Sequence, residues 1–164
     1  MVVVDLGNTL DYLHRAGIVH RDVQPGNVMI RAENGTISPT LIDFGLVGTL
    51  RRQPNGLVED YGRRAAHRIY GAPEAQDGGA VTARADQWSL AATLLSTYVG
   101  HDIYRTHWGE AIHKANFPSA LLSDATTLTS MLRPTEAEAL RKATSFDPAQ
   151  RFESCSAFVS ALRS

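Results

Sequence analysis

The chain has 164 residues, enough for one domain, and its 43% hydrophobic and 20% charged residues are ordinary for a globular protein. A formal net charge of -1 excludes the strongly basic surface that a nucleic-acid or anionic-membrane partner would need. Without a signal peptide, an apolar run near the ~20 residues of a membrane span, or a second cysteine beside Cys155, the chain is expected to be cytoplasmic, with no membrane segment and no disulfide.

The first predicted element is a helix that ends near Gly17, a residue type favoured at helix C-caps. Its apolar residues recur with a period close to 3.6, which is typical of a helix with one buried face: Val2, Val3, Leu6, Leu10 and Leu13. The following segment, 18–27, is predicted to be a loop, because a helix cannot continue through Pro25.

Two apolar runs flank Asn34-Gly35 within residues 28–43, and this pattern predicts a β-hairpin. Asn27 and Asp43 are each eight residues from Gly35 along the chain. If the hairpin turns there, these two oxygen-bearing side chains lie near each other at its open end. The register can slip by a residue, so the prediction is their proximity rather than a specific pairing.

The second half of the chain is predicted to be mostly helical. Residues 46–71 indicate a long irregular loop, and residues 83–100 a core helix that is apolar nearly all round. A shorter helix is expected within 106–123, and a capping box at 135–138 predicts a helix from Glu136 to about Ser145. The last helix begins near Ser154 and is expected to bury four side chains: Cys155, Phe158, Val159 and Leu162. The predicted fold class is therefore mainly α with one small hairpin.

Five short motifs occur in a fixed order along the chain. They are HRDVQPGN at 20–27, DFG at 43–45, APE at 72–74, DQWS at 86–89 and DPAQRF at 147–152. In this order and spacing they resemble the C-terminal lobe of protein kinases of the serine/threonine type. The sequences around the last two motifs are most similar to those of the bacterial members. The resemblance covers 1–164 as one partial kinase domain, with its helical bundle and a small hairpin beside the catalytic loop. Its parts are the catalytic loop 18–27, the hairpin 28–43, the activation segment 43–74 and the helical remainder 82–163.

The resemblance implies a role for each matching residue, and ATP and Mg²⁺ as cofactors. Catalytic roles fall to Asp22, Gln24 and Asn27, with Asp22 accepting the proton of a protein hydroxyl. Cofactor-binding roles fall to Asn27, Asp43 and Gly45, and the metal ligands are Asn27 and Asp43, whose hard oxygen atoms suit Mg²⁺. Structural roles fall to His20, Arg21, Glu74, Asp86 and Arg151.

Several features depart from the family pattern. The 19 residues before His20 contain no glycine-rich loop, strand lysine or helix glutamate, so we expect the N-terminal lobe to be absent and phosphoryl transfer by the chain alone to be negligible. Gln24 replaces a lysine that contacts the transferred phosphate. His67 replaces a threonine that bonds the catalytic aspartate. Between Gly45 and Glu74 the only serine or threonine is Thr49.

These departures bear on the expected partner of Arg21 within the chain and on the expected protein partners of the chain. Because the activation segment has so few phosphorylation sites, Glu59 or Asp60 is a candidate partner for Arg21 in place of a phosphate. The face that would meet an N-terminal lobe should expose apolar surface. We therefore expect a protein substrate, a partner that supplies an N-terminal lobe in trans, or self-association.

Alternatives from other classes remain open. One is a catalytically inactive pseudokinase that serves as a scaffold for partner proteins. Another is a small-molecule phosphotransferase of the aminoglycoside or choline kinase type, which the Ala-Pro-Glu segment opposes. In a third interpretation, Asp22 and Asn27 only form hydrogen bonds with neighbouring backbone groups and have no catalytic role. The six-residue spacing of His101, His107 and His113 does not favour a zinc site, and the Arg51-Arg52 and Arg63-Arg64 pairs are expected to be solvated loop.

Overall fold

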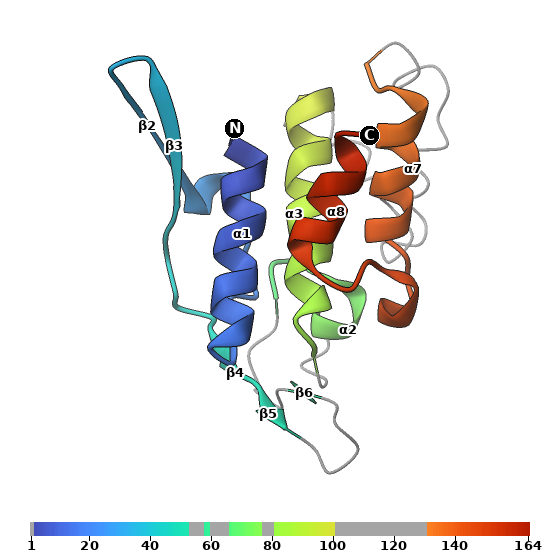
Figure 1. Ribbon diagram of the computed structural model, residues 1–164. Coiled ribbons are helices and arrows are strands. Elements are labelled where there is room, and N and C mark those ends of the chain that lie inside the picture. Colours follow the sequence, from blue (N-terminus) through green and yellow to red (C-terminus); the bar gives the residue numbers. More distant parts are fainter. Residues whose placement is uncertain (1, 53–57, 60–65, 77–80, 101–130) are drawn as a thin grey trace.

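The computed structural model describes residues 2–52, 58–59, 66–76, 81–100 and 131–164. Several sequence predictions lie outside these ranges: the expected helix within 106–123, the three spaced histidines, Asp60 and the Arg63-Arg64 pair. Within them, helices carry the core and the strands form three two-stranded sheets. Figure 1 shows the arrangement in layers, with the hairpin against one helix, two central helices beside it, and a further helix on the opposite side.

Helix α1 (Val2–Arg15) confirms the first prediction. Leu6 and Leu10 are buried, and Val2, Val3 and Leu13 are partly buried against the same core. Gly17 follows the helix end at Arg15; its φ of 78° lies in the left-handed region, which glycine enters without a steric penalty.

The predicted hairpin is present, with its register one residue from the symmetric one. Strands β2 (Val28–Glu33) and β3 (Thr36–Leu41) pair antiparallel around Asn34 and Gly35, both of which have positive φ. Val28 pairs with Leu41, and the ladder extends to Ile42, whose N–H donates to the carbonyl of Asn27 at 2.9 Å. Asn27 therefore faces Ile42, the residue before Asp43, because both Asn34 and Gly35 form the turn.

Two of the predicted loops contain short strands and turns. The segment 18–27 begins with β1 (Ile18–Val19), which pairs with β4 (Gly48–Thr49), and it ends in a 3-10 turn over Pro25–Asn27. The segment 46–71 contains β4 and also β5 (Arg51–Arg52), which pairs with β6 (Val58–Glu59). The prediction of a wholly irregular loop was wrong here, because two-residue strands are too short to leave a period in the sequence.

Helix α3 (Arg84–Val99) confirms the prediction of a core helix. Polar as well as apolar side chains are buried on it, and it ends at Gly100 with a φ of 87°. Ahead of it, the short helix α2 (Pro73–Gln76) carries Glu74. Helix α3 holds the groups that anchor the catalytic loop, Asp86 and Thr93.

The C-terminal helices pack on each other and on α3. Helix α8 (Cys155–Leu162) buries all four of the expected side chains, and Ser154 caps it by accepting from the N–H of Ala157. Helix α7 (Pro134–Ala143) starts two residues before the prediction. The Glu136 carboxylate accepts from the Arg133 N–H at 2.8 Å, and this bond lowers the pKa of Glu136. The predicted capping box at Thr135 was wrong because Pro134 occupies the first helical position.

Candidate active site

The carboxylate of Asp22 lies at the centre of the catalytic loop. One of its oxygen atoms accepts from the side-chain amide of Gln24 at 2.9 Å. The other accepts from the amide nitrogen of Asn27 at 2.6 Å, and the same nitrogen also donates to the Asp22 carbonyl at 2.8 Å. The 3-10 turn at Pro25–Asn27 makes this possible, because it brings Asn27 back over Asp22. The three predicted catalytic residues therefore form one hydrogen-bonded group.

Asp86, which is fully buried on the first turn of α3, anchors the catalytic loop. Its carboxylate accepts from the backbone N–H groups of His20, at 2.8 Å, and of Arg21, at 2.7 Å. The ring Nε2 of His14, at the end of α1, lies 2.8 Å from the same carboxylate. One buried charge thus joins α1, the catalytic loop and α3, as the structural role predicted for Asp86 requires.

Backbone strain is concentrated around this group. Among the described residues other than glycine, positive φ occurs at Asn34 in the hairpin turn, at Arg21 (68°) and at Asp43 (61°). Arg21 lies within the catalytic loop, and Asp43 is the first residue of the Asp-Phe-Gly segment. Residues with side chains enter this region at a cost of about 1–3 kcal/mol each, and such strain clusters at functional sites.

The Asp-Phe-Gly segment lies beside the catalytic loop. The Asp43 carboxylate accepts from the Gly45 N–H at 3.0 Å. The Phe44 ring contacts the ring of His20 edge to face, with centroids 4.9 Å apart, while half of Phe44 remains exposed. His20, buried in the loop, accepts from the Asp22 N–H through Nδ1 at 3.3 Å. His20 is therefore a packed residue that contacts both segments.

The donor set suits a hard cation. The amide nitrogen of Asn27 faces Asp22, which leaves its carbonyl oxygen as the atom for a metal. Asp43 uses one carboxylate oxygen for the Gly45 N–H and keeps the other. Asp43 is exposed, so it can reach a ligand from solvent. Carbonyl and carboxylate oxygens are the ligands that Mg²⁺ prefers in proteins.

A buried ion pair closes the far end of the activation segment. Arg151, 3% exposed, binds Glu74 through two bonds of 2.7 and 2.9 Å. Its guanidinium also donates to three backbone carbonyls and lies 4.9 Å from the ring of Trp88. The carbonyls belong to Arg84, Ser145 and Phe146. The predicted pair is present, and Arg151 acts as a hub for the surrounding loops.

We expect the substitution Arg151→Lys to lower the free energy of unfolding by about 2–3 kcal/mol. A lysine keeps the charge but loses the planar fork, so buried carbonyls are left without donors. Urea unfolding of the two proteins measures the difference. Arg133→Lys is the matched control, because Arg133 is 55% exposed and pairs with Glu136 at 3.3 Å, and it should change stability by less than about 1 kcal/mol. A similar small loss in both variants would contradict the hub role of Arg151.

Sequence reasoning missed three supporting residues. His14 lies outside the five motifs, and they do not predict its bond to Asp86. Thr93 donates to the Val23 carbonyl at 3.2 Å and holds the catalytic loop from α3. Gln87 exchanges hydrogen bonds with the backbone of Phe152. A buried polar residue on an otherwise apolar helix is the signal that could have found Gln87 and Thr93.

Two of the departures from the family pattern concern His67 and the partner of Arg21. Nδ1 of His67 accepts from the N–H groups of Ile69 and Tyr70, at 3.2 and 3.4 Å, so its ring supports the turn that precedes Ala-Pro-Glu. The side chain of Glu59 is outside the described part of the chain, as is Asp60. The hypothesis that one of them pairs with Arg21 therefore stays a prediction.

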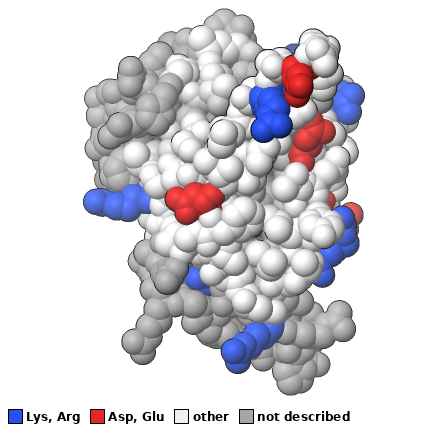
Figure 2. All heavy atoms as spheres, turned by 90° about the vertical axis from the view of Figure 1, so that its left-hand side faces the viewer, with Lys and Arg blue, Asp and Glu red and all other residues white. Residues whose placement is uncertain are grey.

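The face around the hairpin is poor in charge and carries exposed apolar side chains. Figure 2 shows this side, with broad uncharged areas and with acidic and basic side chains close together at its upper right. Met29, Ile30, Ile37 and Phe44 are each about half exposed. A pocket of ≈ 520 Å³ opens nearby, lined mainly by apolar side chains of α1, β2 and α3. The predicted exposed apolar surface is thus present in the described residues.

Comparison with known proteins identifies relatives over nearly the whole chain. The model of the protein kinase domain matches residues 1–161. The serine/threonine-protein kinase PknI of Mycobacterium bovis is 32% identical over 163 residues, which cover 98% of this chain and 23% of PknI. The serine/threonine-protein kinase PknF of Mycobacterium tuberculosis is 31% identical over 166 residues, 98% of this chain and 33% of PknF.

Solved structures agree with the sequence matches. The crystal structure of the Mycobacterium tuberculosis PknI kinase domain aligns with a TM-score of 0.64 and 26% identity, covering 98% of this chain and 52% of that one. The chain therefore spans about half of that kinase domain. In the described ranges, no helix has both the length and the apolar character needed to cross a bilayer.

Proposed function

The chain belongs to the protein kinase family, and on that basis we propose that it supplies the catalytic loop, the magnesium ligands and the activation segment of a serine/threonine kinase domain. The reaction would be transfer of a phosphoryl group from ATP to a protein hydroxyl. The observation that carries the proposal is the half-buried Asp22 carboxylate, held by Gln24 and Asn27 beside the Asp-Phe-Gly segment.

The chemistry assigned to this chain is positioning and proton acceptance. Asp22 would receive the proton of the substrate hydroxyl as the oxygen attacks phosphorus, and the two amide donors would keep its carboxylate pointed at that oxygen. Asn27 and Asp43 would hold magnesium, which neutralises charge on the phosphates when bound. Gln24 supplies a neutral donor where the family resemblance implies a lysine, so the site has one positive charge fewer.

We further propose that the chain is the C-terminal lobe of the domain and acts together with an N-terminal lobe, in the same polypeptide or in trans. Two observations support this. The chain matches about half of a related kinase domain, and its apolar pocket and exposed apolar side chains lie on the side of the hairpin and the first turns of α1. Apolar patches of this kind mark contact surfaces.

The proposal is tested by completing the domain. The chain is joined to the half of the PknI kinase domain that it does not match, and transfer of labelled phosphate from ATP to serine and threonine of a test protein is measured. The intact PknI kinase domain is the positive control. We expect magnesium-dependent transfer. A fusion that is folded and binds ATP but transfers no phosphate would instead indicate a scaffold without catalytic activity.

A further inference from the structure

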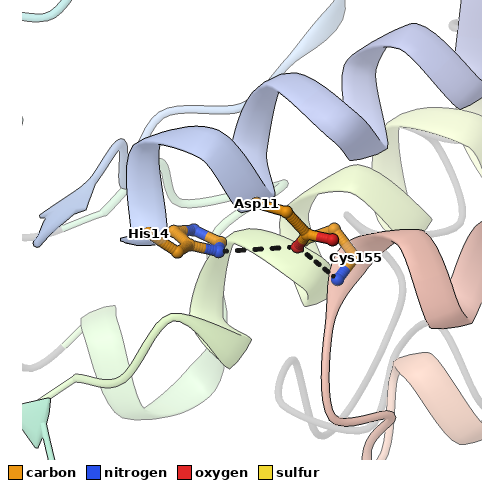
Figure 3. A group of neighbouring side chains, drawn as sticks. All are labelled: Asp11, His14 and Cys155. Carbon is orange, nitrogen blue, oxygen red and sulfur yellow. Dashed lines mark hydrogen bonds and ion pairs between the residues drawn. The ribbon is translucent and has the colours of Figure 1, made fainter. Parts of the chain in front are cut away.

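A second polar cluster lies behind the catalytic loop, where α1 meets the start of α8. It consists of Asp11, His14 and Cys155 (Figure 3). One potential ligand atom from each residue lies within 4.8 Å of the other two. Asp11 and Cys155 are buried, and the side chain of His14 is 11% exposed. None of the three touches a reacting group in the function proposed above.

The ring of His14 lies between the buried Asp86 and this cluster. Its Nε2 is 2.8 Å from the Asp86 carboxylate, a group that accepts hydrogen bonds. Its Nδ1 is 3.9 Å from the nearer carboxylate oxygen of Asp11. This gap is longer than a hydrogen bond, and a cation placed between the two atoms would be bound by both.

The His14–Asp86 bond is also the arrangement that metal sites use around their ligands. A metal-binding histidine commonly donates its other ring N–H to a carboxylate, which fixes the ring and makes the free nitrogen a better ligand. Here the supporting carboxylate is the buried anchor of the catalytic loop. The ring is therefore held ready to use Nδ1 as a ligand.

The remaining ligands complete a mixed set. Asp11 accepts from the N–H groups of Cys155 and Ser156 at 2.9 and 3.0 Å, so its carboxylate is fixed at the start of α8 with lone pairs to spare. Burial raises the pKa of the Cys155 thiol well above its usual value, with the Asp86 and Asp11 charges adding to the effect. A bound cation would offset both causes, since thiolate sulfur is the form that binds metals.

A cavity of ≈ 260 Å³ adjoins the three side chains and offers room for a fourth ligand. Glu153 lines it, as do Arg15 and Arg84. The guanidinium of Arg84 donates to the Pro148 carbonyl at 2.9 Å, which engages one of its nitrogen atoms. Water or the Glu153 carboxylate is the candidate for the open position.

We propose that Asp11, His14 and Cys155 form a binding site for a transition-metal dication of the zinc class. Sulfur, nitrogen and oxygen ligands together select such a borderline cation over Mg²⁺ or Ca²⁺. Ligand atoms of a tetrahedral zinc site are about 3.3–3.7 Å apart, so the cluster must contract by about 1 Å. The metal would join α1 to α8 and, through His14, brace the Asp86 anchor.

Cobalt is the probe that tests this site in the intact 164-residue chain, because Co²⁺ bound to thiolate gives an intense charge-transfer band. Cys155 is the only cysteine, so any such band reports on this cluster alone. We expect the band at mildly alkaline pH to saturate at one Co²⁺ per chain and to disappear on addition of Zn²⁺. No band at saturating Co²⁺, in a chain shown to be folded by circular dichroism, would overturn the proposal.

Two variants test the other ligands without removing the thiol. Asp11→Asn and His14→Gln each keep a polar group of similar size, and each should weaken cobalt binding at least about tenfold while the band remains detectable. An unchanged affinity in both folded variants would show that Cys155 binds with other partners and would refute the site. Saturation at one Co²⁺ per two chains would refute it as well, because it indicates a thiolate bridge between molecules.

Discussion

Replacement of Asp22 by asparagine in the completed kinase domain is expected to lower the rate of phosphoryl transfer by about 10²–10⁴-fold. The physical reason is the loss of the group that accepts the substrate proton. In the parent protein both carboxylate oxygens of Asp22 accept hydrogen bonds, one from Gln24 and one from Asn27. Asparagine replaces one of these oxygens by an NH₂ group, so one of the two donors loses its acceptor. Initial rates at saturating ATP and magnesium measure the effect.

The effect should fall on turnover rather than on nucleotide binding, because Asp22 is not one of the proposed metal ligands. We expect the affinity for ATP to change by less than about tenfold. Asp147→Asn is the matched control, since Asp147 is exposed and caps a 3-10 turn near the other end of the chain, and it should leave the rate unchanged. A rate within about tenfold of the parent for Asp22→Asn would contradict the assignment of Asp22 as proton acceptor.

Replacement of Asp86 by alanine is expected to lower the free energy of unfolding by about 3–5 kcal/mol. The carboxylate is fully buried and accepts from the N–H groups of His20 and Arg21 as well as from His14. Removing it leaves buried donors unsatisfied, at about 1–3 kcal/mol each. Because Arg21 already has strained backbone, the catalytic loop should also lose order first.

Urea unfolding followed by circular dichroism measures this loss. Asp147→Ala removes a carboxylate that accepts from one exposed N–H, that of Ala149, and should cost about 1 kcal/mol or less. Asp86→Asn keeps the volume and one acceptor, so it should fall between the two. If Asp86→Ala were no more destabilising than Asp147→Ala, the anchor would not support the fold as described.

Much of the fold could be predicted from the chain itself because its signals are local. The 3.6-residue period of α1, the Asn34-Gly35 turn and the start of the last helix near Ser154 each depend on a few neighbouring residues, and all three predictions are confirmed. The start of α7 was misplaced because Pro134 and Thr135 both suit a helix start. The strands β1, β4, β5 and β6 were missed because each has only two residues, and β1 and β4 are also far apart along the chain.

For the candidate site, the sequence predicted which residues take part better than it predicted their contacts. The order of the five motifs led to Asp22, Asn27, Asp43 and the Glu74–Arg151 pair, and the structure brings Asp22 and Asn27, as well as Glu74 and Arg151, into contact. The resemblance assigned Gln24 by its position alone, and the structure adds that it holds Asp22. The bond between His14 and Asp86 joins residues 72 apart, and local pattern carries no signal for such a pair.

The central claim is that this chain carries the magnesium and nucleotide chemistry of a kinase, and titration of ATP into the 164-residue chain with and without Mg²⁺ tests it most directly. Asp43→Asn is the matched variant, because Asp43 has a φ of 61° and asparagine tolerates that backbone while removing the charge. We predict magnesium-dependent binding that weakens at least about tenfold in the variant. Binding that is absent, or equal in the two proteins, would contradict the claim.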